Sequence, residues 1–212
     1  MATASTSLSK VKANSLNLAG TFGFTGTVSG FDDTPLVLIS TFTSDGSDAT
    51  ASFTSGIDST YKEYLFVFNN IHPETNDTYF KFQGSTNGGS SYGVTVTTTN
   101  FVAEHSEAGS SPALSYNTGD DLAQSTDFQT LCRRVGGEND ESCSGILKLY
   151  NPSSTTFVKH FTSDFNVYQS QNFSLRSFTA GYFNTTSAIN AVQFKFSSDE
   201  IQGGTIDLFG VV

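Results

Sequence analysis

The residue types that most often carry catalysis or hold metals are scarce in this chain of 212 residues. Its three histidines, His72, His105 and His160, share no His-x-His or His-x-x-x-His spacing. Because one isolated imidazole cannot hold a first-row metal ion, we expect no zinc or cupin-type metal site. A hairpin could bring Cys132 and Cys143 together, but spacing alone does not determine bridge geometry. A disulfide and two reduced thiols therefore both stay open.

Acidic residues and nucleophiles give no stronger signal. Residues 45–48 (DGSD) and 138–141 (ENDE) offer the oxygen ligands that Ca²⁺ prefers, but neither has the spacing of a calcium loop, which favours solvated turns. Asp120 and Asp121 are adjacent and would point to opposite faces of a strand, unlike the paired carboxylates of glycosidases. There is no Gly-x-Ser-x-Gly elbow and no Gly-rich phosphate loop with a Lys. We expect no enzyme, no catalytic residue, no metal and no cofactor.

Tyrosine side chains provide an alternative chemistry, that of a carbohydrate-binding surface on which a flat ring packs against a sugar. Trp, the other residue suited to such a platform, is absent. A Tyr in a strand is more often part of the core or of a cross-strand pair. The candidates for a sugar platform are Tyr61, Tyr64, Tyr92, Tyr116 and Tyr168.

The composition indicates a β-rich protein. The chain has 30 Ser, 28 Thr, 20 Phe and 8 Tyr, and only 14% of its residues are charged, compared with about 25% in typical proteins. Its net charge of −10 disfavours binding to a phosphate backbone, so we expect no nucleic-acid partner. No apolar run approaches the roughly 18 residues of a membrane span, and no apolar block follows Lys10 and Lys12. We therefore expect neither a membrane partner nor a cleaved secretion signal.

Short segments of alternating apolar and polar residues follow one another from residue 35 onward. In residues 79–84 (YFKFQG), alternation places Phe80 and Phe82 on one face and Lys81 and Gln83 on the other. Such segments, separated by turn residues, predict an all-β sandwich or barrel. The expected strands are residues 36–42, 50–54, 61–69, 79–84, 93–102, 128–135, 146–150, 157–165, 173–183, 191–197 and 205–211. Apart from 128–135, we expect residues 104–142 to be irregular.

Residues 1–34 differ from the rest in being rich in small, polar and Gly residues. We predict an extended N-terminal arm over residues 1–34 that precedes a domain of residues 35–212. The arm could attach to another chain or add a strand to its own domain, and both alternatives stay open. The apolar residues expected to attach it are Val11, Leu16, Leu18, Phe22, Phe24 and Val28.

Several strand and turn segments occur in a distinctive order along residues 35–212. They are FTSGIDSTY at 53–61, Tyr64, FVFNNIHP at 66–73, FQ at 82–83, GGSSY at 88–92, SCSG at 142–145, YNPSS at 150–154, KH at 159–160, GY at 181–182, FKFSS at 194–198 and GGTIDLFG at 203–210. Each segment alone is common, and their order carries the information. In this order the chain resembles virion structural proteins of tailed bacteriophages, especially marine, cyanophage-like ones. The resemblance brings no catalytic residues with it.

This resemblance implies a jelly-roll-like antiparallel β-sandwich exposed on a virion, on the head or in the tail. We expect a non-enzymatic structural protein, assembled in the host cytoplasm, whose partners are other virion proteins (major capsid or tail proteins). A homotrimer or another symmetric homo-oligomer is expected, since closed symmetry satisfies repeated interfaces. The chain has no long shaft repeats, which favours a capsid decoration protein. The alternative is a tail fibre or tail-associated host-recognition protein that binds a host surface glycan.

Overall fold

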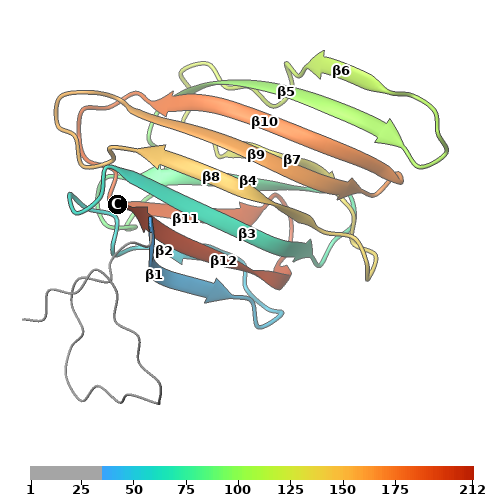
Figure 1. Ribbon diagram of the computed structural model, residues 1–212, viewed down its shortest axis with the longest axis horizontal. Coiled ribbons are helices and arrows are strands. Elements are labelled where there is room, and N and C mark those ends of the chain that lie inside the picture. Colours follow the sequence, from blue (N-terminus) through green and yellow to red (C-terminus); the bar gives the residue numbers. More distant parts are fainter. Residues whose placement is uncertain (1–34) are drawn as a thin grey trace, which may run out of the picture. The chain divides into compact units, whose positions relative to one another are not determined.

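Residues 35–212, which the computed structural model describes, form β-strands joined by turns and loops (Figure 1). The strands are β1 (Leu36–Thr43), β2 (Ala51–Phe53), β3 (Glu63–Pro73), β4 (Thr78–Ser85), β5 (Val96–Ser106), β6 (Ala113–Tyr116), β7 (Gln129–Val135), β8 (Cys143–Tyr150), β9 (Lys159–Gln169), β10 (Phe173–Phe183), β11 (Ala191–Phe196) and β12 (Ile201–Val211). Each paired strand runs antiparallel to its neighbour. The predicted all-β class is confirmed.

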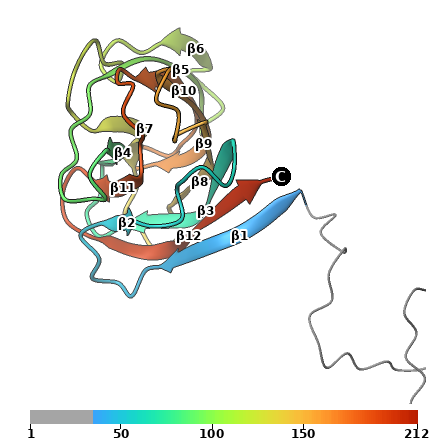
Figure 2. The ribbon, with the colours of Figure 1, turned by 90° about the vertical axis from the view of Figure 1, so that its left-hand side faces the viewer.

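The strands are arranged in two layers. The larger sheet has the order β1-β12-β3-β8-β9-β10-β5-β6, and the smaller sheet has the order β7-β4-β11-β2. A single residue pair, Val135 with Gln169, joins β7 to β9 and links the layers at one side. Figure 2 shows the larger sheet curving, with β11, β4 and β7 on its concave side. The molecule is thus an antiparallel β-sandwich.

The winding of the strands is jelly-roll-like. The pairs β3·β12, β4·β11, β5·β10 and β8·β9 are nested in sequence, each enclosed by the one before it. The second pair lies in the smaller sheet and the other three lie in the larger one. A long antiparallel ribbon folded over itself in this way gives the Greek-key connections of a jelly roll. The predicted jelly-roll-like sandwich is confirmed for residues 35–212.

The core lies between the layers and is dominated by phenylalanine. Phe194 of β11 sits at its centre, with its ring centroid 5.0 Å from that of Phe68 and 5.2 Å from that of Phe66. Phe53, Phe80 and Phe82 pack on it at 6.0–6.1 Å. Phe80 and Phe82 stack on Phe194 and the other three rings meet it edge-to-face, and both geometries add to the stabilisation that area burial alone provides. The phenylalanine core therefore holds the two sheets packed against each other.

All the expected strands are present, but several bounds differ: β3 extends to Pro73, β5 to Ser106 and β9 to Gln169. β6 falls in the segment that we expected to be irregular; it pairs with β5 at the edge of the larger sheet, Ala103 lying opposite Leu114. Gln83 shares a face of β4 with Lys81, as alternation predicts, but it is buried beneath a loop. Among residues 35–212 no helix is long and apolar enough to cross a membrane. The six apolar residues expected to attach the arm lie outside the described residues.

Candidate functional site

The residues with catalytic or metal-binding potential are spread over the fold. His72, His105 and His160 lie on β3, β5 and β9, and the Nδ1 atom of His72 is 2.6 Å from the carbonyl oxygen of Glu141. Within residues 35–212 no three His, Cys, Asp or Glu side chains are placed to hold a metal ion. Cys132 and Cys143 are both buried free thiols, so the disulfide left open by the sequence is not formed.

The acidic turns are organised by their own hydrogen bonds. The Asp45 carboxylate accepts from the backbone N–H of Ser47 at 3.0 Å and from its hydroxyl at 2.7 Å. These bonds lower the pKa of Asp45. The Glu141 carboxylate accepts from the backbone N–H of Glu138 at 2.7 Å. Both sequences thus form side-chain-stabilised turns.

The five tyrosines do not form one platform. The Tyr64 ring is fully buried and Tyr61 packs edge-on against it, with ring centroids 5.8 Å apart. The buried hydroxyl of Tyr92 has no hydrogen-bond partner among the described residues. Tyr116 of β6 is 53% exposed, and Tyr168 of β9 lines a shallow pocket with His105. Tyr64 is therefore excluded from ligand contact, and Tyr116 is the most exposed of the five rings.

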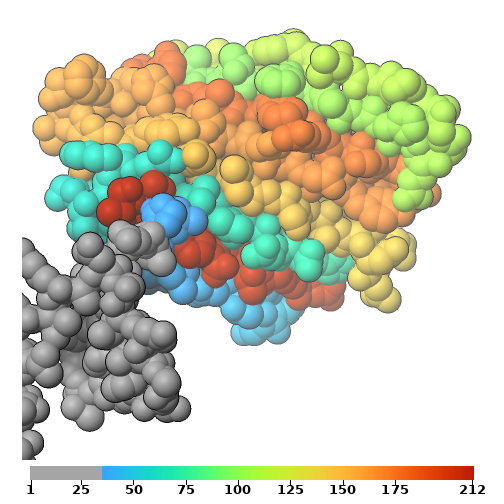
Figure 3. Space-filling view, in the orientation of Figure 1, coloured from blue at the N-terminus to red at the C-terminus, as the bar shows by residue number. Residues whose placement is uncertain are grey.

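One candidate surface is a groove on the outer face of the larger sheet, the face turned toward the viewer in Figure 3. The groove has a volume of about 570 Å³, and Ala103, Leu114 and Arg176 are among its lining residues. Beside it, the exposed Phe101 ring stacks on Phe178, with centroids 4.7 Å apart. This surface combines apolar area with charged groups.

The second candidate surface is a pocket on the outer face of the smaller sheet, which we call the lysine pocket. It measures about 410 Å³ and lies between strands β4, β11 and β7 and the loop formed by residues 117–128. Lys81 of β4 and Lys195 of β11 line it and are direct cross-strand neighbours. Like charges directly opposite each other on neighbouring strands are destabilising. Such a pair is therefore a departure from what the fold alone would favour.

The loop that walls the lysine pocket is held down by buried amide side chains. The Gln83 Nε2 atom donates to the carbonyl oxygens of Thr126 and Asp127, at 3.2 and 2.9 Å. The Gln129 Nε2 atom donates to the carbonyl oxygen of Asp120 at 2.7 Å. Both amides are almost completely buried, where hydrogen bonds are strongest. The sheet thus fixes the position of the loop at several points.

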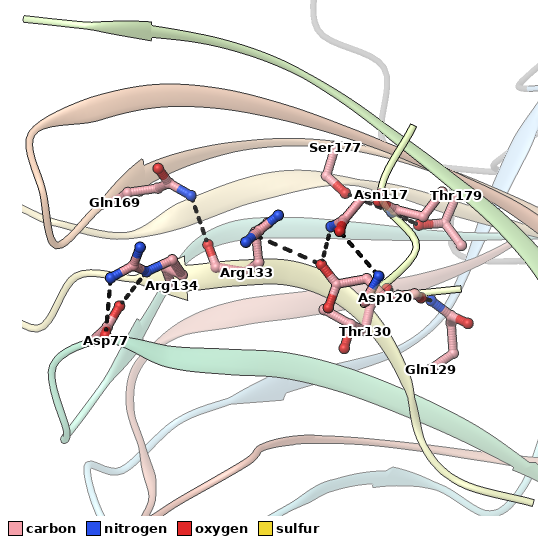
Figure 4. A network of polar contacts seen from close by, with 12 residues as sticks. Asp77, Asn117, Asp120, Gln129, Thr130, Arg133, Arg134, Gln169, Ser177 and Thr179 are labelled. Carbon is pink, nitrogen blue, oxygen red and sulfur yellow. Dashed lines mark hydrogen bonds and ion pairs between the residues drawn. The ribbon is translucent and has the colours of Figure 1, made fainter. Parts of the chain in front are cut away.

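A polar network continues from this loop into the space between the layers (Figure 4). Asp120 accepts a hydrogen bond from Asn117, and its Oδ2 atom lies 3.7 Å from the Arg133 Nε atom. Asn100 donates to the hydroxyls of Ser177, at 3.2 Å, and Thr179, at 2.9 Å. The Asn100 Oδ1 and Arg133 Nε atoms are buried with no hydrogen-bond partner among the described residues. The interior here is polar, unlike the phenylalanine core.

Sequence reasoning missed the lysine pocket. Alternation did place Lys81 on the outer face of its strand, but nothing local connects it with Lys195, far away in the sequence. Only the register of β4 against β11 makes them neighbours. The one signal in the sequence is that each lysine alternates with apolar residues in its own strand.

Comparison of the chain with protein-family models, with curated proteins and with solved structures finds no match.

Proposed function

We propose that the protein is a non-enzymatic structural component of a tailed-phage virion. In this proposal the β-sandwich is displayed on the particle surface as a capsid decoration, residues 1–34 anchor it to neighbouring virion proteins, and copies assemble with closed symmetry. The proposal rests on the ordered segments that resemble such proteins and on the way in which the chain enters the sandwich.

The observation that carries the proposal is that the described chain begins at one edge of the larger sheet. Pro35 precedes β1, the edge strand, and its carbonyl oxygen accepts from the N–H of Val212 at 3.0 Å. β6 forms the opposite edge of the same sheet (Figure 1). Residues 1–34 are therefore connected to the sandwich at its β1 edge, the edge opposite β6.

The outer surface suits a protein packed at high local concentration. Thr97 and Thr99 of β5 and Thr162 of β9 line the outer face of the larger sheet. The chain carries a net charge of −10, which opposes binding to a nucleic acid and keeps copies soluble. Neutral hydroxyl groups and negative charge together support a surface role on the outside of a particle.

Deleting residues 1–34 tests the anchor. The expected result is a sandwich that folds, with an unchanged far-ultraviolet circular dichroism spectrum, but that is missing from particles assembled in its presence. A full-length variant with Phe22→Ser and Phe24→Ser is the matched control for chain length and should also be lost from particles. Full incorporation of the truncated protein would show that the anchor is not in residues 1–34.

Counting copies per particle distinguishes head from tail. A decoration protein binds repeatedly over the capsid lattice and is therefore present in many copies, whereas a tail component is present in the few copies that tail symmetry requires. Quantitative mass spectrometry against the major capsid protein gives this ratio. A ratio close to that of known tail proteins would replace decoration with a tail location.

A second candidate function is host recognition by a tail fibre or tail-associated protein that binds a surface glycan. The groove beside Phe101 and Tyr116 favours it, because it pairs exposed rings with polar groups. Retention on a host glycan array should be lost in Tyr116→Ala. Phe157→Ala, which removes an even more exposed ring from a loop outside this groove, should bind as the unsubstituted protein does.

A further inference from the structure

We propose that the lysine pocket binds an acidic sugar, a saccharide unit that carries a carboxylate beside its hydroxyl groups. This inference does not depend on where the protein sits in a particle. It rests on the two lysines of the pocket, which have no ion-pair partner within residues 35–212, on the acidic groups opposite them and on the fixed loop that forms the wall.

The two lysines are available to an anion. Among the described residues, Arg133, Arg134, Lys148 and Arg176 each form an ion pair with a carboxylate. Neither Lys81 nor Lys195 does so, and neither ammonium group donates a hydrogen bond to another described side chain or carbonyl. Both side chains are half-buried. An anion between them would remove the repulsion that their placement creates and would accept charge-assisted hydrogen bonds.

Both lysines lie near an aromatic ring: the Lys81 Nζ atom is 5.9 Å from the centroid of Tyr79, and the contact of Lys195 is closer. The Lys195 Nζ atom lies 4.3 Å from the centroid of the Phe128 ring, in cation–π geometry. Phe128 itself belongs to the pocket lining. The ring holds the ammonium group within the pocket while leaving its N–H groups free to donate. It also offers apolar area for the C–H face of a sugar.

The pocket is not a simple anion site, because carboxylates also line it. Asp120 is already engaged by Asn117 and Arg133 through Oδ2, and its Oδ1 atom receives no hydrogen bond from the described side chains. Asp127 lies at the exposed rim. These oxygens accept only, so a ligand must bring donors as well as a negative charge. A sugar acid supplies both, with its carboxylate toward the lysines and its hydroxyls toward the aspartates.

The size and rigidity of the site fit one or two sugar rings. A volume of about 410 Å³ falls at the small end of the range for ligand pockets. The wall is held by Gln83 and Gln129, so little ordering is needed on binding. A long polyanion such as a nucleic acid would instead meet the two aspartates and the net charge of −10.

The test uses the full-length protein and a matched pair of ligands. Methyl β-D-glucuronoside and methyl β-D-glucoside differ only at C6, which is a carboxylate in the first and a hydroxymethyl group in the second. Binding is followed by amide chemical-shift changes in ¹⁵N-labelled protein. We expect the glucuronoside to shift amides around Lys81, Phe128 and Lys195, with the glucoside and inorganic phosphate binding at least about tenfold more weakly. Lys81→Gln and Lys195→Gln should each weaken glucuronoside binding about tenfold, whereas Lys62→Gln, an exposed lysine outside the pocket, should not.

Each other outcome contradicts the inference. Equal binding of glucoside and glucuronoside would remove the role of the charge. Phosphate binding as tight as the glucuronoside would make the site a general anion site. An absence of shifts at the pocket with every ligand would remove the site. Unchanged thermal melting of both lysine variants shows that any loss of binding is not a loss of folding. Incorporation of Lys81→Gln into particles is measured separately, so that a failure of the sugar site can be told apart from a failure of the proposed virion role.

Discussion

The thiols of Cys132 on β7 and Cys143 on β8 are buried neighbours that come from different sheets. Both remain free and buried. Burial raises the pKa of the Cys132 thiol well above its usual range, and the neighbouring Cys143 raises it further. Because both thiols are buried, a reagent in solution cannot reach either of them as long as the sandwich stays closed.

The two thiols should therefore report on opening of the sandwich. In native buffer at neutral pH we expect neither to react with a thiol reagent such as 5,5′-dithiobis(2-nitrobenzoate), and both to react in guanidinium chloride. Absorbance at completion gives the number of reacting groups. Rapid labelling of either thiol under native conditions would contradict the packing described for β7 and β8.

Lys159 is a fully buried cation without an acidic partner in residues 35–212. Its Nζ atom donates to the carbonyl oxygens of Phe157, at 2.8 Å, and Thr185, at 3.0 Å. Burial lowers the pKa of Lys159 below its ordinary value of 10.5. The unfolded chain therefore binds more protons than the folded protein between the lowered pKa and 10.5, and the free energy of unfolding rises with pH in that window.

Replacing Lys159 by Met tests this linkage. The free energy of unfolding of the unsubstituted protein, minus that of Lys159→Met, should increase as pH is raised toward 10.5. Lys148 provides the opposite sign, because its pairing with Glu63 raises its pKa. The corresponding difference for Lys148→Met should stay constant below pH 10.5 and fall above it. Urea unfolding at several pH values measures both, and a difference for Lys159 that falls with pH would contradict the burial.

The sequence predicted the strands of the phenylalanine core but not the edge strand β6. Phe80 and Phe82 alternate with polar residues, and the structure buries both. Ala113–Tyr116 carries no such signal, because all four residues are exposed. Their extended form follows from pairing with β5, which no local pattern encodes. Residue alternation thus identifies strands that cover a core and misses those that only extend a sheet.

The candidate site depended on long-range register, which the sequence did not show. Lys81 and Lys195 become neighbours because Phe82 pairs with Phe194 and Phe80 with Phe196 on the same two strands. The apolar residues that fix this register point inward, and the lysines follow on the outer face. Alternation puts Gln83 on the same face as Lys81 but does not show that Gln83 is buried. The loop that covers it comes from a distant part of the chain.

A close approach between strands makes Gly145 of β8 sensitive to substitution. A Cβ atom at this position would lie 2.4 Å from the carbonyl oxygen of Asp164 and 2.6 Å from the Phe165 ring. Gly145→Ala should therefore lower the free energy of unfolding by about 1–3 kcal/mol. Gly203→Ala is the matched control, because its Cβ would meet nothing closer than His72 at 3.7 Å, and it should change stability by less than about 0.5 kcal/mol. Equal effects in urea unfolding would contradict the close packing at Gly145.

Gln83 links the sheet to the wall of the lysine pocket, so its loss should loosen the loop without unfolding the core. Gln83→Met leaves the carbonyl oxygens of Thr126 and Asp127 without their donor, a cost of about 1–3 kcal/mol. Amide hydrogen exchange should accelerate in residues 117–128 and stay slow in β3 and β12. Gln193, directly opposite Gln83 on β11, donates only to the Ser52 hydroxyl at the surface, so Gln193→Met should leave exchange unchanged. If the two variants exchange alike, the loop is held by other contacts, and the rigidity assigned to the pocket through Gln83 is wrong.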